Sequence, residues 1–83
     1  MQRFTSSAIK AAHYQRAGRR LYVWFQPDGV LYEYRGVSAR VYAGLIAADS
    51  KGTYVNAHIR EDYPFTKLGA RPLKPPDRPG AAP

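Results

Sequence analysis

Apolar and aromatic side chains form two dense runs in the N-terminal half of the chain, at residues 20–26 and 30–35. Both runs are rich in aromatic and β-branched residues, which favour strands. Between them, Pro27 presets φ for a turn, and Gly29 can adopt the positive φ that a tight turn needs. The pattern therefore predicts a β-hairpin with a four-residue loop at 26–29.

The hydrophobic pattern also selects the register of this hairpin. The loop places Phe25 opposite Val30, and a slip by one residue would move Glu33 onto the apolar face. Burial of one face therefore favours a core side made of Leu21, Val23, Phe25, Val30, Tyr32 and Tyr34. On the other side the same register pairs Arg20 with Arg35, Tyr22 with Glu33, and Trp24 with Leu31.

A first strand is expected over residues 5–14, although alanines weaken its alternation. Its favoured phase places Ile9 and Ala11 on one face and Lys10 on the other. This strand would precede the hairpin in a simple meander, with a polar, glycine-containing connection at 15–19.

The apolar spacing becomes helical after the hairpin. Ser38 is a suitable N-cap, and apolar residues then recur three or four positions apart, which predicts a main helix over 39–49. Gly52 is expected to supply the left-handed residue that ends this helix or the short turn after it, and a short second helix is expected over 53–60. The predicted fold class is α+β: a three-stranded antiparallel β-meander packed against one main helix plus a short second helix.

Composition sets the scale of the molecule. The 83-residue chain contains no cysteine, so its stability depends on one small core. We expect one domain over 1–69 and a disordered tail over 70–83, because the tail contains five prolines and little that is apolar. No apolar run approaches the roughly 20 residues of a membrane span, and residues 1–6 lack a signal-peptide pattern. These features predict a cytoplasmic protein without a membrane partner.

The charge points to an anionic partner. Thirteen lysines and arginines against six acidic residues give a net charge of +7. The excess is not confined to the tail, since residues 1–69 carry ten bases and five acids. A basic folded body is typical of proteins that bind nucleic acid, although basic charge can also serve solubility alone.

The sequence offers no catalytic or metal-binding pattern. His13 and His58 stand 45 positions apart, with no cysteine near either. The segment 50–53 lacks the upstream glycine of a phosphate loop, and the neighbouring carboxylates Glu61 and Asp62 should point in different directions. We therefore expect a protein that is not an enzyme and carries no cofactor.

One end of the predicted sheet gathers arginines. The hairpin brings the start of its first strand beside the end of its second, so Arg20 and Arg35 face each other. An anion such as phosphate would relieve this repulsion, because guanidinium groups bind phosphate bidentately. The alternative is that both side chains simply extend into solvent. The arginines expected at this end are Arg16, Arg19, Arg20, Arg35 and Arg40.

The face away from the predicted core carries Tyr22 and Trp24. An aromatic pair beside arginines is typical of a base-stacking platform. Alternatively, the first strand, the second helix or a partner subunit covers this face, since large aromatic side chains are usually packed. Tyr32 and Tyr34 are expected on the core side, where their rings pack.

Taken in order, these elements resemble the KTSC domain, a small family named after a module at the C-terminus of some lysyl-tRNA synthetases. The resemblance covers roughly residues 6–65 and depends on the ordered set, with the Tyr32-x-Tyr34 pair at its centre. It implies a small α+β fold but no established activity; for the family, RNA binding has been suggested from the synthetase context. The matching positions are Ser6, Ile9, Tyr14, Leu21, Val23, Phe25, Tyr32, Tyr34, Val37, Val41, Tyr42, Ala48, Ser50, Gly52, Tyr54, Asn56, Ile59 and Arg60.

Charge, aromatic residues and resemblance together favour a non-enzymatic nucleic-acid-binding module, with RNA ahead of DNA as the partner. Its expected contacts are Arg16, Arg19, Arg20, Arg35, Arg40, Tyr22 and Trp24. The alternative is a protein-interaction module, for example a bacterial or phage accessory factor that docks on a larger complex through its aromatic face. The sequence does not choose between these partners or fix an oligomeric state.

Overall fold

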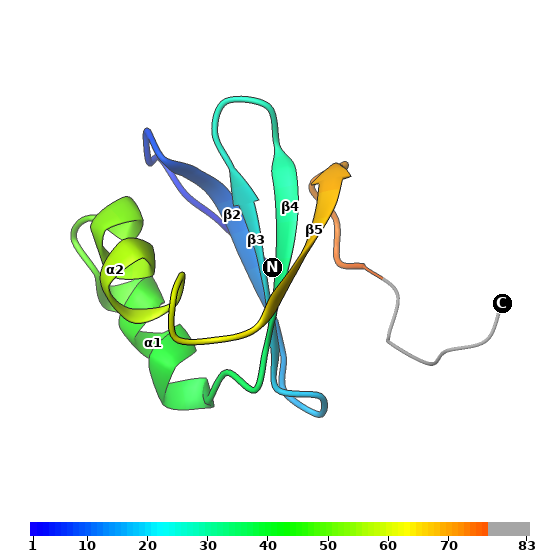
Figure 1. Ribbon diagram of the computed structural model, residues 1–83. Helices are drawn as coiled ribbons and strands as arrows, with labels where there is room; N and C mark the ends of the chain where they lie inside the picture. Colours follow the sequence, from blue (N-terminus) through cyan, green and yellow to red (C-terminus); the bar gives the residue numbers. More distant parts are fainter. Residues whose placement is uncertain (77–83) are drawn as a thin grey trace, which may run out of the picture.

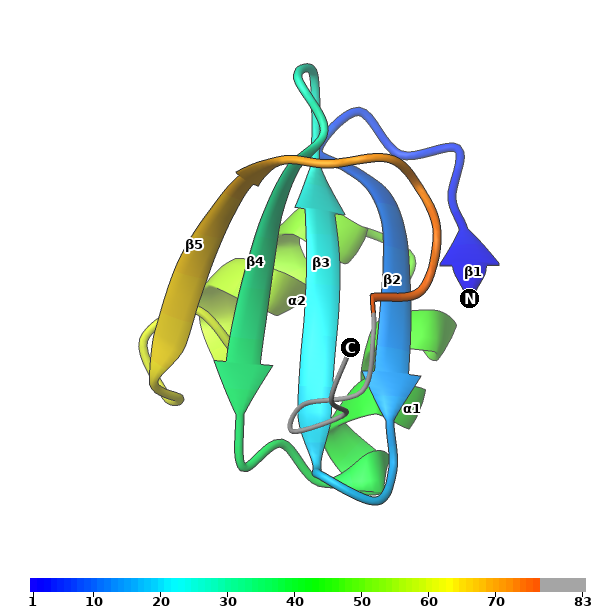
Figure 2. The same cartoon turned by 90° about the vertical axis from the view of Figure 1, so that its right-hand side faces the viewer.

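The computed structural model describes residues 1–76, which form one antiparallel sheet and two helices. The strands follow one another across the sheet in the order β1-β2-β3-β4-β5 (Figure 2). Both helices lie between β4 and β5 in the chain and cover one face of the sheet (Figure 1). The elements are β1 (Gln2–Arg3), β2 (Ile9–Gln15), β3 (Arg20–Phe25), β4 (Val30–Arg35), α1 (Ala39–Ala47), α2 (Lys51–His58) and β5 (Phe65–Ala70).

The predicted α+β class is confirmed, but the sheet has five strands rather than three. The two additional strands are its edges. β1 is only two residues long, and β5 pairs with β4 so that Phe65 lies opposite Tyr34 and Lys67 opposite Tyr32. The sequence pattern missed β5 because most of its side chains are exposed, which leaves no clear hydrophobic alternation.

The β3–β4 hairpin forms in the predicted register. All six predicted pairs are present, from Phe25 opposite Val30 at the turn to Arg20 opposite Arg35 at the open end. Gly29 closes the turn with a φ of 71°, and its N–H donates to the carbonyl of Phe25 at 2.9 Å. The positive φ is the reason for glycine at this position.

The prediction that Ile9 and Ala11 share a face is wrong. A β-bulge between them shifts the pairing, so that Ile9 lies opposite Phe25 but Ala11 lies opposite Trp24. Ile9 therefore joins the core beneath the helices, whereas Ala11 packs on the other face of the sheet. The extra residue, Lys10, reverses the side-chain alternation after it.

The larger core lies between the sheet and the helices. Ser38 caps α1 as predicted, since its hydroxyl accepts a hydrogen bond from the N–H of Val41 at 3.3 Å. Leu45 of α1 and Val55 of α2 are the buried residues through which the helices pack against the sheet. Neither helix in the described part of the chain is long and apolar enough to cross a membrane. The buried members of this core are Ile9, Ala12, Leu21, Val23, Tyr34, Val37, Leu45, Val55 and Ile59.

The second helix begins two residues earlier than predicted. Ser50 caps it, with its hydroxyl accepting from the N–H of Thr53 at 3.3 Å. Gly52 therefore lies inside the first turn of α2 and does not have a positive φ, so the prediction of a left-handed residue that ends the first helix or the turn after it is wrong. Its role is close approach, because a Cβ at this position would lie 2.7 Å from the Cβ of Ala8.

The opposite face of the sheet carries a second buried cluster. It comprises Ala11, Tyr22, Trp24 and Leu31, with Leu68 and Leu73 packed against it. Leu73 comes from residues 71–76, which leave β5 and cross this face (Figure 2).

Disorder was predicted over residues 70–83, but residues 70–76 lie against the sheet. Ala70 ends β5, and the carbonyl of Pro72 accepts a hydrogen bond from the indole of Trp24 at 3.0 Å. Residues 77–83, the rest of the predicted tail, lie outside the described residues. The prediction relied on proline content and did not anticipate the contacts that Pro72 and Leu73 make with this face.

The contact between the helices depends on Gly44 of α1. The Tyr54 hydroxyl of α2 donates to the carbonyl of Val41 at 2.9 Å, and a Cβ at Gly44 would collide with that hydroxyl. Gly44→Ala should therefore lower the free energy of unfolding by about 1–3 kcal/mol, as overpacking does. The loss is expected although alanine favours helix by about 1 kcal/mol. Thermal and urea denaturation measure the change.

The control for this prediction removes the colliding atom. Tyr54→Phe in the Gly44→Ala background deletes the hydroxyl and should recover part of the lost stability. A Gly44→Ala variant as stable as the wild type would mean that the helices do not pack as described.

Candidate nucleic-acid interface

The predicted arginines do gather at one end of the sheet. Arg16 and Arg19 are exposed in the β2–β3 turn, where Arg19 has a φ of 52°. The N–H of Val37 donates to the carbonyl of Arg19 at 2.9 Å and holds the approach to α1 against this turn. Arg40 is exposed in the first turn of α1, three residues further on. This end of the molecule therefore presents exposed cations from two segments, the β2–β3 turn and the first turn of α1.

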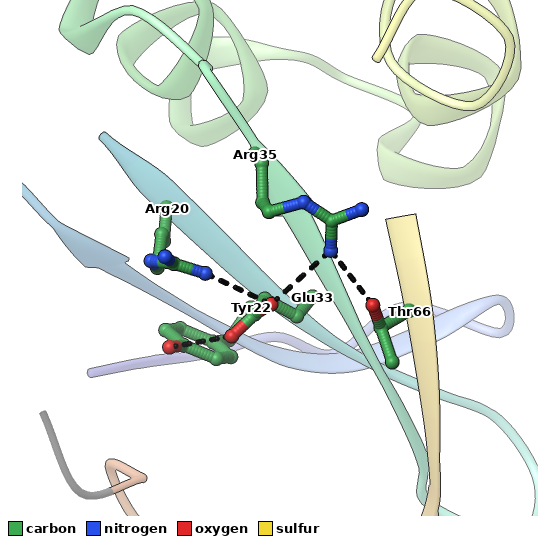
Figure 3. Close-up of polar contacts among 5 residues, drawn as sticks. All are labelled: Arg20, Tyr22, Glu33, Arg35 and Thr66. Atoms are coloured by element: carbon green, nitrogen blue, oxygen red, sulfur yellow. Dashed lines mark hydrogen bonds and ion pairs between the residues drawn. The ribbon is translucent and has the colours of Figure 1, made fainter. Parts of the chain in front are cut away.

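Glu33 occupies the place between Arg20 and Arg35 where an external anion was expected. Its Oε1 accepts from both guanidinium groups, at 3.1 and 3.4 Å, and its Oε2 accepts from the Tyr22 hydroxyl at 3.0 Å (Figure 3). Arg35 also donates to the hydroxyl of Thr66 at 2.7 Å. The chain's own carboxylate thus relieves the repulsion, and the pair is not an open phosphate clamp.

The prediction that Tyr22 and Trp24 form an exposed stacking surface is wrong. Their side chains are 2% and 0% exposed. Leu68 of β5 and Leu73 beyond it pack against them, and both segments were absent from the predicted sheet. A nucleobase cannot reach either ring in this conformation, so Tyr22 and Trp24 drop out of the candidate interface.

Several accessible aromatic side chains lie on the helix side of β4 and β5. There they line a pocket of about 430 Å³. Phe65 is 50% exposed, and its ring lies 5.4 Å from that of Tyr32, which in turn meets Phe25 edge-on at 5.3 Å. The full lining is Phe25, Val30, Tyr32, Tyr34, Arg60, Glu61, Phe65 and Lys67.

Charged groups surround these rings. Arg60 and Glu61 come from the loop after α2, and Lys67 comes from β5, directly opposite Tyr32. All three are exposed, and Arg60 donates to the Asn56 side chain at 3.3 Å. Aromatic rings with cations at their edge can hold a flat, anionic ligand, with stacking for its plane and ion pairs for its charge.

Sequence reasoning missed this pocket because it had no β5. Tyr32 and Phe25 were assigned wholly to the core, yet both remain partly accessible. The signal that could have found the site is the spacing of Phe65 and Lys67, two residues apart and thus on one face of a strand. Weak alternation over six residues did not distinguish that strand from a loop.

Fold and pocket together define a small α+β domain with a ligand-sized aromatic pocket beside an antiparallel sheet. The model of the KTSC domain family matches residues 5–63, so the chain belongs to the KTSC domain family, as its sequence pattern predicted. No curated protein matches the chain.

A solved structure agrees with this assignment. The crystal structure of the KTSC domain protein YPO2434 from Yersinia pestis matches with a TM-score of 0.77 at 31% sequence identity. The match covers 82% of this chain and 94% of that one.

The Glu33 network makes a stability prediction. Glu33→Gln keeps the shape of the side chain but leaves Arg20 and Arg35 facing each other without a counter-charge. Because the Glu33 side chain is only 16% exposed, we expect the free energy of unfolding to fall by about 1–2 kcal/mol, between the values for surface and buried pairs. Urea denaturation measures this loss.

Glu61→Gln provides the matched control, since Glu61 is exposed and forms no ion pair with another described residue. It should change stability by less than about 0.5 kcal/mol. Equal effects of the two substitutions would show that Glu33 acts only through net charge.

Two buried tyrosines predict a loss of stability at high pH. Burial is the main cause that raises the pKa of Tyr22 to about 12, with the Glu33 hydrogen bond adding to it, and burial likewise raises the pKa of Tyr34 to about 12. The folded state thus holds these protons more tightly than the unfolded state, whose tyrosines ionise near pH 10.0. The contribution of the two tyrosines to the free energy of unfolding is complete below pH 10 and is lost as the pH rises toward 12.

Melting temperatures between pH 8 and pH 11.5 test this linkage. Tyr34→Phe removes one of the two groups and should flatten the fall above pH 10 relative to the wild type. If the two curves stay parallel throughout, Tyr34 does not carry the effect.

Proposed function

We propose that this chain is a non-enzymatic module that binds single-stranded nucleic acid, RNA in preference to DNA, in the aromatic pocket. The observation that carries the proposal is the pocket itself, where the accessible rings of Tyr32 and Phe65 lie beside the cations Arg60 and Lys67. Single-strand binding proteins combine these two features, because every base has a face to stack and every nucleotide a phosphate.

Stacking supplies the first part of the affinity. Phe65 is half-exposed at the edge of β5, and Tyr32 is partly buried behind it, so one face of the aromatic cluster is open to a ligand. A base stacked on an aromatic side chain contributes about 1–3 kcal/mol to binding, as judged from the affinity lost when the aromatic residue is replaced by alanine. The volume of about 430 Å³ falls within the usual range for small-ligand sites.

Phosphate contacts supply the second part. Arg60 and Lys67 hold the backbone beside the stacked base, and the exposed Arg16, Arg19 and Arg40 extend the positive surface at the open end of the hairpin. Arg20 and Arg35 belong to this surface only secondarily, since Glu33 already neutralises part of their charge. The net charge of +7 attracts a polyanion to the whole domain.

The preference for RNA depends on the 2′-hydroxyl, which can both donate and accept hydrogen bonds. The phenol of Tyr32 and the carboxylate of Glu61 line the pocket and offer suitable partners. DNA lacks this group and would retain only the stacking and phosphate contacts.

Binding of a fluorescent single-stranded RNA, measured by anisotropy at several salt concentrations, tests the proposal. Phe65→Ala should weaken binding by about 1–3 kcal/mol and leave the salt dependence unchanged, because stacking releases no counterion. Lys67→Ala should instead weaken binding and reduce the slope of log Kd against log salt by about one phosphate contact, roughly 0.7 for a single strand.

Arg3→Ala is the matched control for Lys67→Ala. It removes the same charge from β1, at the opposite edge of the sheet from β5, and should leave the slope almost unchanged. An equal effect of both substitutions would indicate nonspecific attraction rather than a site.

The protein-interaction alternative is favoured by the exposure of Phe65, which is unusual for a large apolar side chain. It predicts a partner whose affinity is lost in Phe65→Ala yet responds weakly to salt. Wild-type protein with no salt-dependent affinity for RNA or DNA would rule out the nucleic-acid proposal and leave this alternative.

A further inference from the structure

Residues 71–76, which we term the strap, cross the face of the sheet opposite the helices. The strap reads Arg-Pro-Leu-Lys-Pro-Pro and lies beyond residues 5–63, the part of the chain that the family model matches. In Figure 2 it runs from the end of β5 across β4 and β3. It lies on the opposite face of the sheet from the proposed nucleic-acid pocket.

Two groups of the strap fit the sheet face specifically. The carbonyl of Pro72 accepts from the indole N–H of Trp24 at 3.0 Å, and the side chain of Leu73 packs into the cluster with Leu31 and Leu68. Trp24 is 0% exposed, so its N–H needs an acceptor from the protein. The face thus recognises an acceptor carbonyl followed by an apolar side chain.

Proline-rich peptides suit such a face for physical reasons. Proline has no N–H, so it brings a carbonyl acceptor without a donor that would have to be satisfied in the groove. Its fixed φ also lowers the entropy lost on binding, and this is why proline-rich segments dock in aromatic-lined grooves. Between the strap and β4 a further cavity of about 320 Å³ is lined by Leu31, Arg71, Pro72, Lys74, Pro75 and Pro76.

The strap is held by few contacts. Apart from the indole hydrogen bond, the N–H of Arg71 donates to the carbonyl of Gly29 in the β3–β4 turn at 3.2 Å, and Nε of Arg71 donates to the carbonyl of Leu68 in β5 at 3.0 Å. The N–H of Lys74 bonds within the strap, to the carbonyl of Pro72 at 2.9 Å. Most of its side chains are exposed, and Leu73 is only partly buried. Segments with so little buried apolar contact open at low free-energy cost.

We propose that the face formed by Trp24, Leu31 and Leu68 is a docking site for proline-rich peptides that carry a Pro-Leu step, and that the strap occupies this site in cis. An opened strap leaves a buried indole donor and an apolar cluster facing water, and a second segment of the same chemistry restores both contacts. The partner is therefore a protein with an exposed Pro-Leu segment, bound on the face that the RNA pocket does not use.

Competition with the strap sets the apparent affinity. A peptide in trans binds only the fraction of molecules whose strap is open, so its apparent Kd is the intrinsic Kd divided by that fraction. The strap has the advantage of being tethered, at an effective concentration in the millimolar range. Weakening the strap should thus strengthen binding in trans, which a strap with a purely structural role would not produce.

The experiment uses the full chain and its single tryptophan, Trp24, as the fluorescent probe. Leu73→Asp unseats the strap while leaving the docking face unchanged. The ligand is the end-blocked peptide Arg-Pro-Leu-Lys-Pro-Pro, and the control peptide carries Asp in place of Leu. We expect Leu73→Asp to shift the emission of Trp24 to longer wavelength, and the first peptide, but not the control, to reverse the shift. Wild-type protein should bind the same peptide about tenfold more weakly or worse.

Each outcome decides the proposal. A Leu73→Asp emission spectrum equal to that of the wild type, or no reversal by millimolar peptide, overturns it. Should Leu73→Asp fail to fold, the Trp24 indole resonance of wild-type protein, followed by NMR during the same titration, replaces the readout and must move with the first peptide alone. The peptide titration does not involve RNA, so its result does not depend on whether the aromatic pocket binds nucleic acid.

Discussion

The constraint on which the structure depends is that the β3–β4 hairpin is apolar on both faces. The register that buries Leu21, Val23 and Tyr34 on one side necessarily turns Tyr22 and Trp24 to the other. Leaving either face in water would forfeit the burial of its apolar side chains, so the sheet is covered on both sides. Two short helices cover one side, and Leu68 of β5 with Leu73 of the strap covers the other.

The same register fixes the electrostatics of the open end. Pairing Arg20 with Arg35 would be unfavourable alone, but it also brings Glu33 beside Tyr22, from where its carboxylate reaches both guanidinium groups. The strand alternation thus places Glu33 where its carboxylate offsets the repulsion between the two arginines, which was the role expected for a bound phosphate. Exposed cations remain at this end in Arg16, Arg19 and Arg40, and others, such as Lys67 and Arg60, belong to β5 and to the loop before it.

Local pattern was enough to predict the hairpin, its register and the first helix, because each depends on residues close in sequence. It failed where a distant segment decided the outcome. From the local pattern alone, Tyr22 and Trp24 are expected to be exposed. They are covered by Leu68 and Leu73, which are distant in the chain. The hydrogen bond from Trp24 to Pro72 likewise spans 48 residues. The bulge at Lys10 likewise depends on the partner strand rather than on alternation within β2.

β5 joins the two proposed sites, because its side chains alternate between them. Phe65 and Lys67 face the aromatic pocket, while Leu68, the extra residue at the register shift against β4, packs against the Trp24 cluster beneath the strap. β5 is an edge strand with mostly exposed side chains, so its pairing with β4 is among the least protected in the sheet. A ligand that requires the paired form, in either proposed site, would stabilise that form. By linkage, occupation of one site would then favour the strand arrangement that the other requires, without any contact between the two ligands.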